Sequence, residues 1–161
     1  MGLFKSAKGS VISENFVLLE DVGQLKKDLV VEVVLYDEHL ELTAPFMKKT
    51  PISLKYAQIT DVFYGMQTEI VTKSKSPIGR AVAGGLLFGG AGAVIGAISG
   101  TGKKEKKVNK FYFVVSYTSS AGEDKLLQFE DTRLYKGRKL AAKLKELCGL
   151  PDEFAEDVTE L

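Results

Sequence analysis

The feature that most constrains this chain is a charge-free run of twenty residues, Ala81–Gly100 (AVAGGLLFGGAGAVIGAISG). Nine of the sixteen glycines lie between Gly79 and Gly102. As one helix, the run would be about 30 Å long, the thickness of a bilayer core. A flexible, partly disordered linker is the alternative, because each glycine costs a helix about 1 kcal/mol relative to alanine. Linkers are normally polar, however, so we expect membrane insertion or apolar packing instead.

Small residues recur every four positions in this run, along two ridges. One ridge is Ala81, Gly85, Gly89, Ala93 and Ala97, and the other is Gly84, Phe88, Gly92, Gly96 and Gly100, interrupted only by Phe88. Stacked small residues let two helix backbones approach closely. The pattern predicts close packing, either within a helical hairpin that turns near Gly89-Gly90 or between copies of the chain.

Cations flank the run on both sides, where they can contact anionic lipid headgroups. They are Lys73, Lys75 and Arg80 before the run, and Lys103, Lys104, Lys106 and Lys107 after it. Together with the small ridges they define the predicted site for membrane binding or self-association. Its residues are Arg80, Gly85, Phe88, Gly89, Gly92, Gly96, Gly100, Lys103, Lys104, Lys106 and Lys107.

Two phosphate-binding motifs are incomplete in this segment. A Walker A loop ending at Gly102-Lys103 lacks its first glycine, because Ala97 stands there. A dinucleotide fingerprint starting at Gly90 lacks its last glycine, because Ile95 stands there. We therefore expect no nucleotide cofactor.

The composition argues against most enzyme classes. The single cysteine, Cys148, excludes an intramolecular disulfide and a cysteine-based zinc site. The single histidine, His39, leaves no histidine-pair metal site and no good partner for a nucleophile. The formal net charge of +1 argues against a nucleic-acid partner. We expect no enzymatic activity, no cofactor and no metal, with His39 solvated or locally hydrogen-bonded and Cys148 partly buried in a last helical turn.

The residues on either side of the glycine-rich run predict an α+β fold. Period-two alternation and β-branched runs predict strands at Asn15–Glu20, Leu29–Tyr36, His39–Thr43, Ile52–Leu54, Asp61–Tyr64, Gln67–Lys73, Lys110–Tyr117 and Lys125–Phe129. A single helical turn is expected over Tyr56–Thr60, and tight turns at Asp37-Glu38 and Ser119–Gly122. Gly65 is expected to break the chain between two of the strands. Leucines at helical spacing then predict one helix over 133–148. Asp131 or Thr132 is its expected N-cap, and Gly149 and Pro151 are its stop signals.

These elements together resemble the pleckstrin-homology-like (PH/GRAM) superfold, and more specifically small bacterial or phage PH-like proteins with a glycine-zipper segment. The resemblance rests on Ile52-Ser53-Leu54 with Ile59-Thr60-Asp61-Val62, on Gly79-Arg80-Ala81 through Gly100, and on Phe111–Tyr117. It implies a barrel of about seven strands with the C-terminal helix plugging one end. It also implies that the glycine-rich segment interrupts the barrel between its sixth and seventh strands. Families of this kind are expected to be non-catalytic binding modules for membranes or proteins.

The expected domain organisation follows from these boundaries. Residues 1–13 are a tail, residues 14–75 and 108–149 form the barrel with its closing helix, and residues 76–107 are the insertion. Residues 150–161 are an acidic tail, which carries Asp152, Glu153, Glu156, Asp157 and Glu160 without a cation. Without a secretory pattern at the N-terminus, we expect a cytoplasmic protein, or one peripheral on the inner membrane face.

Strands before and after the insertion pair in one domain, so both must lie on the same side of any membrane. The insertion is then expected to enter and leave on one face, as two helices of about ten residues each, about 15 Å deep. The expected partner is membrane lipid or a protein, and a homo-oligomer is a further expectation. The alternative is a soluble interaction module that self-associates through the glycine zipper without lipid.

Overall fold

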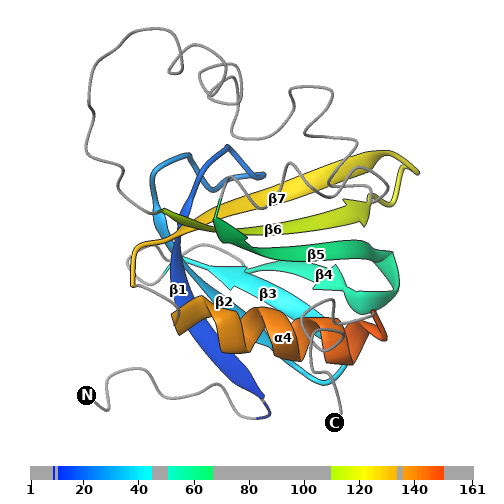
Figure 1. The fold of residues 1–161 in the computed structure, drawn as a ribbon. Coiled ribbons are helices and arrows are strands. Elements are labelled where there is room, and N and C mark those ends of the chain that lie inside the picture. Colours follow the sequence, from blue (N-terminus) through cyan, green and yellow to red (C-terminus); the bar gives the residue numbers. More distant parts are fainter. Residues whose placement is uncertain (1–8, 10, 45–50, 67–109, 134–135, 151–161) are drawn as a thin grey trace, which may run out of the picture.

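The computed structural model describes residues 9, 11–44, 51–66, 110–133 and 136–150, which form one sheet, a short turn and one helix (Figure 1). The elements are β1 (Ile12–Leu18), β2 (Val30–Leu35), β3 (His39–Thr43), β4 (Ile52–Lys55), the 3-10 turn η1 (Tyr56–Gln58), β5 (Ile59–Met66), β6 (Phe111–Thr118), β7 (Asp124–Asp131) and α4 (Lys136–Cys148). The described residues thus confirm seven strands and a C-terminal helix.

The strands form one antiparallel sheet in the order β4-β3-β2-β1-β7-β6-β5. Its two edges, β4 and β5, are separated in sequence by η1 alone. The sheet must therefore curl until both edges lie within reach of that turn. Among the described residues, β4 and β5 do not pair with each other, so the sheet is not closed by hydrogen bonds at this point. The turn η1 connects the two edges instead.

Both predicted hairpin turns are confirmed. The Tyr36 N–H donates to the His39 carbonyl at 2.9 Å, which closes the two-residue turn at Asp37-Glu38. At the β6–β7 turn, the Gly122 N–H donates to the Ser119 carbonyl at 2.9 Å. Gly122 has a φ of 82°, which glycine adopts without strain. These local signals fix which strands are neighbours.

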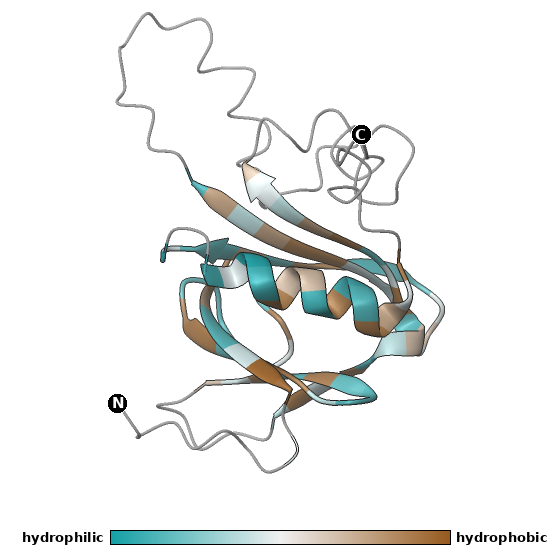
Figure 2. Cartoon of the chain, turned by 60° about the horizontal axis from the view of Figure 1, so that its bottom comes forward, coloured by the Kyte–Doolittle hydropathy of each residue, from teal (hydrophilic) through white to brown (hydrophobic). Residues whose placement is uncertain are grey.

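The core lies inside the curled sheet and beneath α4. Phe16, Phe113 and Phe129 form its centre, with ring centroids 5.1 to 5.7 Å apart. The helix contributes three buried residues to the same cluster: Leu140, Ala141 and Leu144. α4 lies across one end of the curled sheet and closes it (Figure 2). This arrangement confirms the predicted plugging helix.

Asp131 joins the sheet to the helix. Its Oδ2 accepts hydrogen bonds from the Tyr64 hydroxyl at 2.5 Å and from the Gly137 N–H at 2.8 Å, and its Oδ1 accepts from the Arg133 N–H at 2.9 Å. Gly137 is the second residue of α4, so this carboxylate satisfies a helix N-terminal donor. Asp131 itself ends β7, however, so the prediction that it is the N-cap residue of the helix is wrong. The helix begins at Lys136, slightly later than predicted.

The helix ends where the sequence predicts. Gly149 has a φ of 68°, and its N–H donates to the Glu146 carbonyl at 3.1 Å. The next N–H, of Leu150, donates to the Lys145 carbonyl at 2.9 Å. A left-handed glycine with these two bonds satisfies the last helix carbonyls.

Gly65 does not break the chain, contrary to the sequence prediction. β5 continues through it to Met66, because Gly65 pairs with Tyr112 in an unbroken antiparallel register with β6. The strand predicted at Gln67–Lys73 lies outside the described residues. Among the described strands, the glycine-rich segment therefore follows the fifth strand, β5, and precedes the sixth, β6.

Candidate interaction surface

The glycine-rich segment leaves and rejoins the sheet at one place. Met66, the last residue of β5, pairs with Phe111, the first residue of β6. Residues 67–110 therefore start and finish at the same end of two neighbouring strands. Lys110, just before β6, forms an ion pair with Glu130 of β7, with a distance of 3.6 Å between the charged atoms.

All eleven residues of the predicted site lie outside the described residues, so their arrangement stays a prediction. They are Arg80, Gly85, Phe88, Gly89, Gly92, Gly96, Gly100, Lys103, Lys104, Lys106 and Lys107. The same holds for the whole of the insertion predicted at 76–107 and for the acidic tail beyond Leu150. In the part of the chain that is described, no helix has the length and apolar character needed to cross a bilayer.

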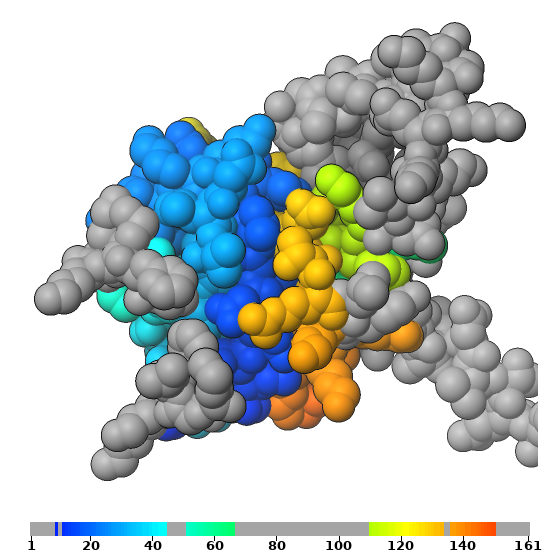
Figure 3. Space-filling view, turned by 90° about the vertical axis from the view of Figure 1, so that its left-hand side faces the viewer, coloured from blue at the N-terminus to red at the C-terminus, as the bar shows by residue number. Residues whose placement is uncertain are grey.

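The side of β5, β6 and β7 that faces away from the core carries a buried row of residues, which we call the outer face. Phe63, Val114 and Gln128 stand side by side in this row, and their exposed fractions are 1%, 0% and 1%. Their neighbours along each strand point into the core cluster, which excludes Phe63 and Val114. β1, β7 and β6 lie side by side on this side of the molecule (Figure 3).

Sequence reasoning missed the burial of this face. The signal was present in Lys110–Tyr117 (KFYFVVSY), which is apolar at nearly every position. In a strand with one solvent-exposed face, apolar and polar residues alternate, whereas a strand buried on both faces has a continuous run of apolar residues. The run in β6 thus indicated a second contact surface.

Acidic and amide groups border the outer face. Burial raises the pKa of the Glu20 carboxyl, and a hydrogen bond from the Gln128 side chain partly offsets this effect. On the opposite border, the Asp61 Oδ1 accepts a hydrogen bond from the Val62 N–H at 2.9 Å. The adjoining Thr60 hydroxyl donates to the Ser116 hydroxyl at 3.0 Å. The row is therefore apolar at its centre and polar at its borders.

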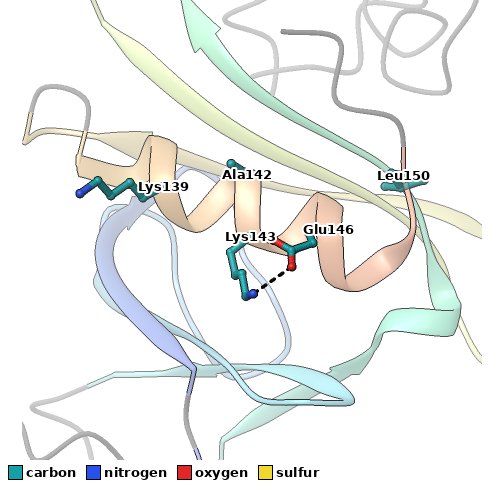
Figure 4. Close-up of a pocket in the computed structure, with 5 residues that line it drawn as sticks. All are labelled: Lys139, Ala142, Lys143, Glu146 and Leu150. Carbon is teal, nitrogen blue, oxygen red and sulfur yellow. Dashed lines mark hydrogen bonds and ion pairs between the residues drawn. The ribbon is translucent and has the colours of Figure 1, made fainter. Parts of the chain in front are cut away.

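The exposed side of α4 forms a second, shallow surface. Lys139, Ala142, Lys143, Glu146 and Leu150 line a depression of about 540 Å³ (Figure 4). Within it, the Lys143 Nζ donates to the Glu146 Oε1 at 3.1 Å. Lys136 and Lys139 are exposed and Lys143 is half-buried, so these three lysines face solvent on one side of α4. An exposed pair of this kind contributes little to stability.

The single histidine, His39, and the single cysteine, Cys148, both lie against neighbouring groups of the fold. The His39 Nε2 lies 3.1 Å from the Glu41 Oε1, and its ring stacks on Tyr36 with centroids 4.8 Å apart. The predicted local hydrogen bond of His39 is thus confirmed. Cys148 is half-buried in the last turn of α4, as predicted, and burial raises the pKa of its thiol to about 11. The described residues hold no cluster of three or more metal-ligating side chains.

Cys148 is expected to react slowly with thiol reagents. Raising its pKa from 9.0 to about 11 lowers the thiolate fraction near neutral pH about a hundredfold, and only the thiolate attacks. Ellman's reagent at pH 8 should therefore label the folded chain about a hundredfold more slowly than the chain unfolded in guanidinium. Equal rates in the two states would contradict this burial of the thiol.

Comparison with known proteins decides the family. A family model described as "Glycine zipper containing PH domain" matches residues 23–127, which is more than half of the chain. The chain belongs to this family. The match runs from the β1–β2 connection to β7, and so includes the whole glycine-rich run, as the sequence resemblance implied. No curated protein matches the chain.

This glycine-zipper PH domain is therefore placed among PH-like domains, which are generally non-catalytic modules for binding or interaction. Its sheet and closing helix agree with that fold. The GRAM-like and bacterial or phage details of the resemblance stay predictions.

Proposed function

We propose that this glycine-zipper PH domain is a non-catalytic binding module that associates with membranes through its glycine-rich segment and the flanking lysines. One observation carries the proposal. Met66 and Phe111, from which the segment departs and to which it returns, are paired neighbours in the sheet. A segment anchored in this way enters and leaves a bilayer on one face while the sheet stays outside it.

The proposed contact is a short hairpin. Two arms of about ten residues, turning at Gly89-Gly90, would reach about 15 Å, or half the hydrocarbon core. The small ridges let the arms pack closely. Lysines at 103, 104, 106 and 107 would contact anionic headgroups, each worth about 1 kcal/mol near the surface. The protein would then be cytoplasmic and peripheral on the inner membrane face.

A second candidate function is self-association without lipid, which the two ridges of small residues also favour. In that case the segment would pair with the same segment of another copy. The partner would be a second chain, and the domain would be a soluble interaction module.

Liposome flotation distinguishes the two. We expect the intact chain to float with vesicles that contain anionic lipid, and to float less as salt rises, because screening weakens the lysine contacts. Deletion of residues 77–107 should abolish flotation, and replacing the four lysines with glutamine should weaken it at least about tenfold at low salt. The matched control replaces Lys136, Lys139 and Lys143 on α4 with glutamine, and it should float like the intact chain.

The alternative predicts a different pattern. Oligomers of the intact chain in gel filtration, lost on deletion of 77–107 and accompanied by no flotation of any variant, would support self-association and contradict membrane binding.

A further inference from the structure

The outer face of β5, β6 and β7 is covered, although it lies opposite the core. Phe63 and Val114 are 1% and 0% exposed, yet neither belongs to the core cluster. Tyr112 lies two residues before Val114 in β6, on the same side of the sheet. It is half-buried, and burial raises the pKa of its hydroxyl. An apolar row of this kind stays out of water only when other atoms lie on it.

The described helix does not supply this cover. The described helix, α4, packs through Leu140, Ala141 and Leu144 into the core on the other side of the sheet. The seven described strands all belong to the sheet itself. The connection after β1 borders the face at one edge, where the Leu19 N–H donates to the Gln128 carbonyl at 3.0 Å. Neither α4 nor the strands of the sheet therefore account for the cover over the centre of the row.

The position of the chain ends indicates which segment this is. Residues 67–110 depart from Met66 and return to Phe111, at the ends of the two strands that carry Phe63 and Val114. The N-terminal residues instead join β1 at Ile12, which pairs with Leu35 of β2 at the end away from β7. Residues 45–50 connect β3 to β4, in the half of the sheet beyond β1. Residues 151–161 carry five carboxylates, which suit an apolar row poorly.

The composition of the long connection suits an apolar sheet face. Its central run, Ala81–Gly100, carries no charge and contains large apolar residues: Leu86, Leu87, Phe88, Val94, Ile95 and Ile98. Fourteen residues separate Met66 from the start of the run, and ten separate its end from Phe111, enough to reach back at about 3.3 Å per residue. The small ridges allow the backbone to approach a flat sheet closely.

We propose that, in the absence of lipid, the run Ala81–Gly100 docks on the outer face of β5, β6 and β7 of its own chain. The inference goes beyond membrane association, because it concerns where the apolar run lies when no bilayer is present. Its failure would leave the flotation experiment unaffected.

Photo-crosslinking of the full chain without lipid tests this. Benzoylphenylalanine replaces Tyr112, and crosslinked peptides are mapped by mass spectrometry. We expect a crosslink from position 112 to residues 81–100 within monomers. The matched control places the same probe at Tyr36, a half-buried aromatic at the end of β2, and should crosslink to 81–100 several-fold less. Crosslinks from position 112 to residues 1–10 or 151–161, or equal yields from both positions, would overturn the proposal.

A crosslink to 81–100 found in dimers and absent from monomers would also overturn the proposal, because a second copy would then be the occupant. Should the Tyr112 variant fail to fold by circular dichroism, the probe is moved to Phe88. From there we expect crosslinks to 59–66 or 111–131 within the same chain, and crosslinks to any other region would contradict docking.

Discussion

Asp131→Ala is expected to lower the free energy of unfolding by about 4 kcal/mol, because charge-assisted hydrogen bonds are lost and buried donors are left without a partner. The carboxylate is 4% exposed and accepts from the Tyr64 hydroxyl and from the Gly137 N–H. Both donors are buried with it, so water cannot replace the carboxylate. Chemical denaturation followed by circular dichroism measures the change.

The neighbouring Thr132 provides the control. It is exposed, and the sequence offers it as an N-cap equally well. Thr132→Ala should change the free energy of unfolding by no more than about 0.5 kcal/mol. Similar losses in the two variants would show that Asp131 does not join sheet and helix as described.

Gly137→Ala is expected to destabilise the domain by about 3 kcal/mol, although alanine is the better helix former by about 1 kcal/mol. A Cβ at this position would lie 2.5 Å from the Phe16 Cε1 and 2.9 Å from the Asp131 Oδ2. Phe16 cannot give way easily, because it is 1% exposed and packed against Phe113 and Phe129. Thermal and chemical unfolding of the variant measure the loss.

The control is Gly149→Ala, at the other end of the helix. A Cβ there meets nothing within 4 Å, but the φ of 68° is strained for alanine. We expect a loss of about 1 kcal/mol from backbone strain alone. A Gly137→Ala variant as stable as the unsubstituted chain would contradict the close packing of α4 on Phe16.

Local signals in the sequence predicted much of the fold. Asp37-Glu38, Gly122 and Gly149 act through their own backbone conformations, so the hairpins and the helix end could be located without tertiary information. Asp131 was predicted as the N-cap, but it lies at the end of β7 and reaches the Gly137 N–H from there, and its bond to Tyr64, distant in sequence, was not predicted. β1 begins earlier than predicted, because residues 12–14 pair with the apolar residues 33–35 of β2, although Ser13 and Glu14 are polar.

The features that escaped prediction depend on contacts distant in sequence. Gly65 remains in a strand because β6 supplies its partner, Tyr112. The burial of Phe63 and Val114 depends on what covers the outer face, which a single strand pattern cannot specify. The eleven predicted site residues lie outside the described residues, so the membrane hairpin remains a proposal.

Depth-dependent fluorescence quenching tests the proposed membrane contact most directly. A Gly90→Cys variant in a Cys148→Ser background carries one fluorophore at the proposed turn, and liposomes contain quenchers at graded depths. A hairpin about 15 Å deep places the turn near the centre of a core about 30 Å thick, so we expect the deepest quenchers to act most strongly. Full exposure of the fluorophore to water with liposomes present, or its accessibility from the far compartment, would contradict the account.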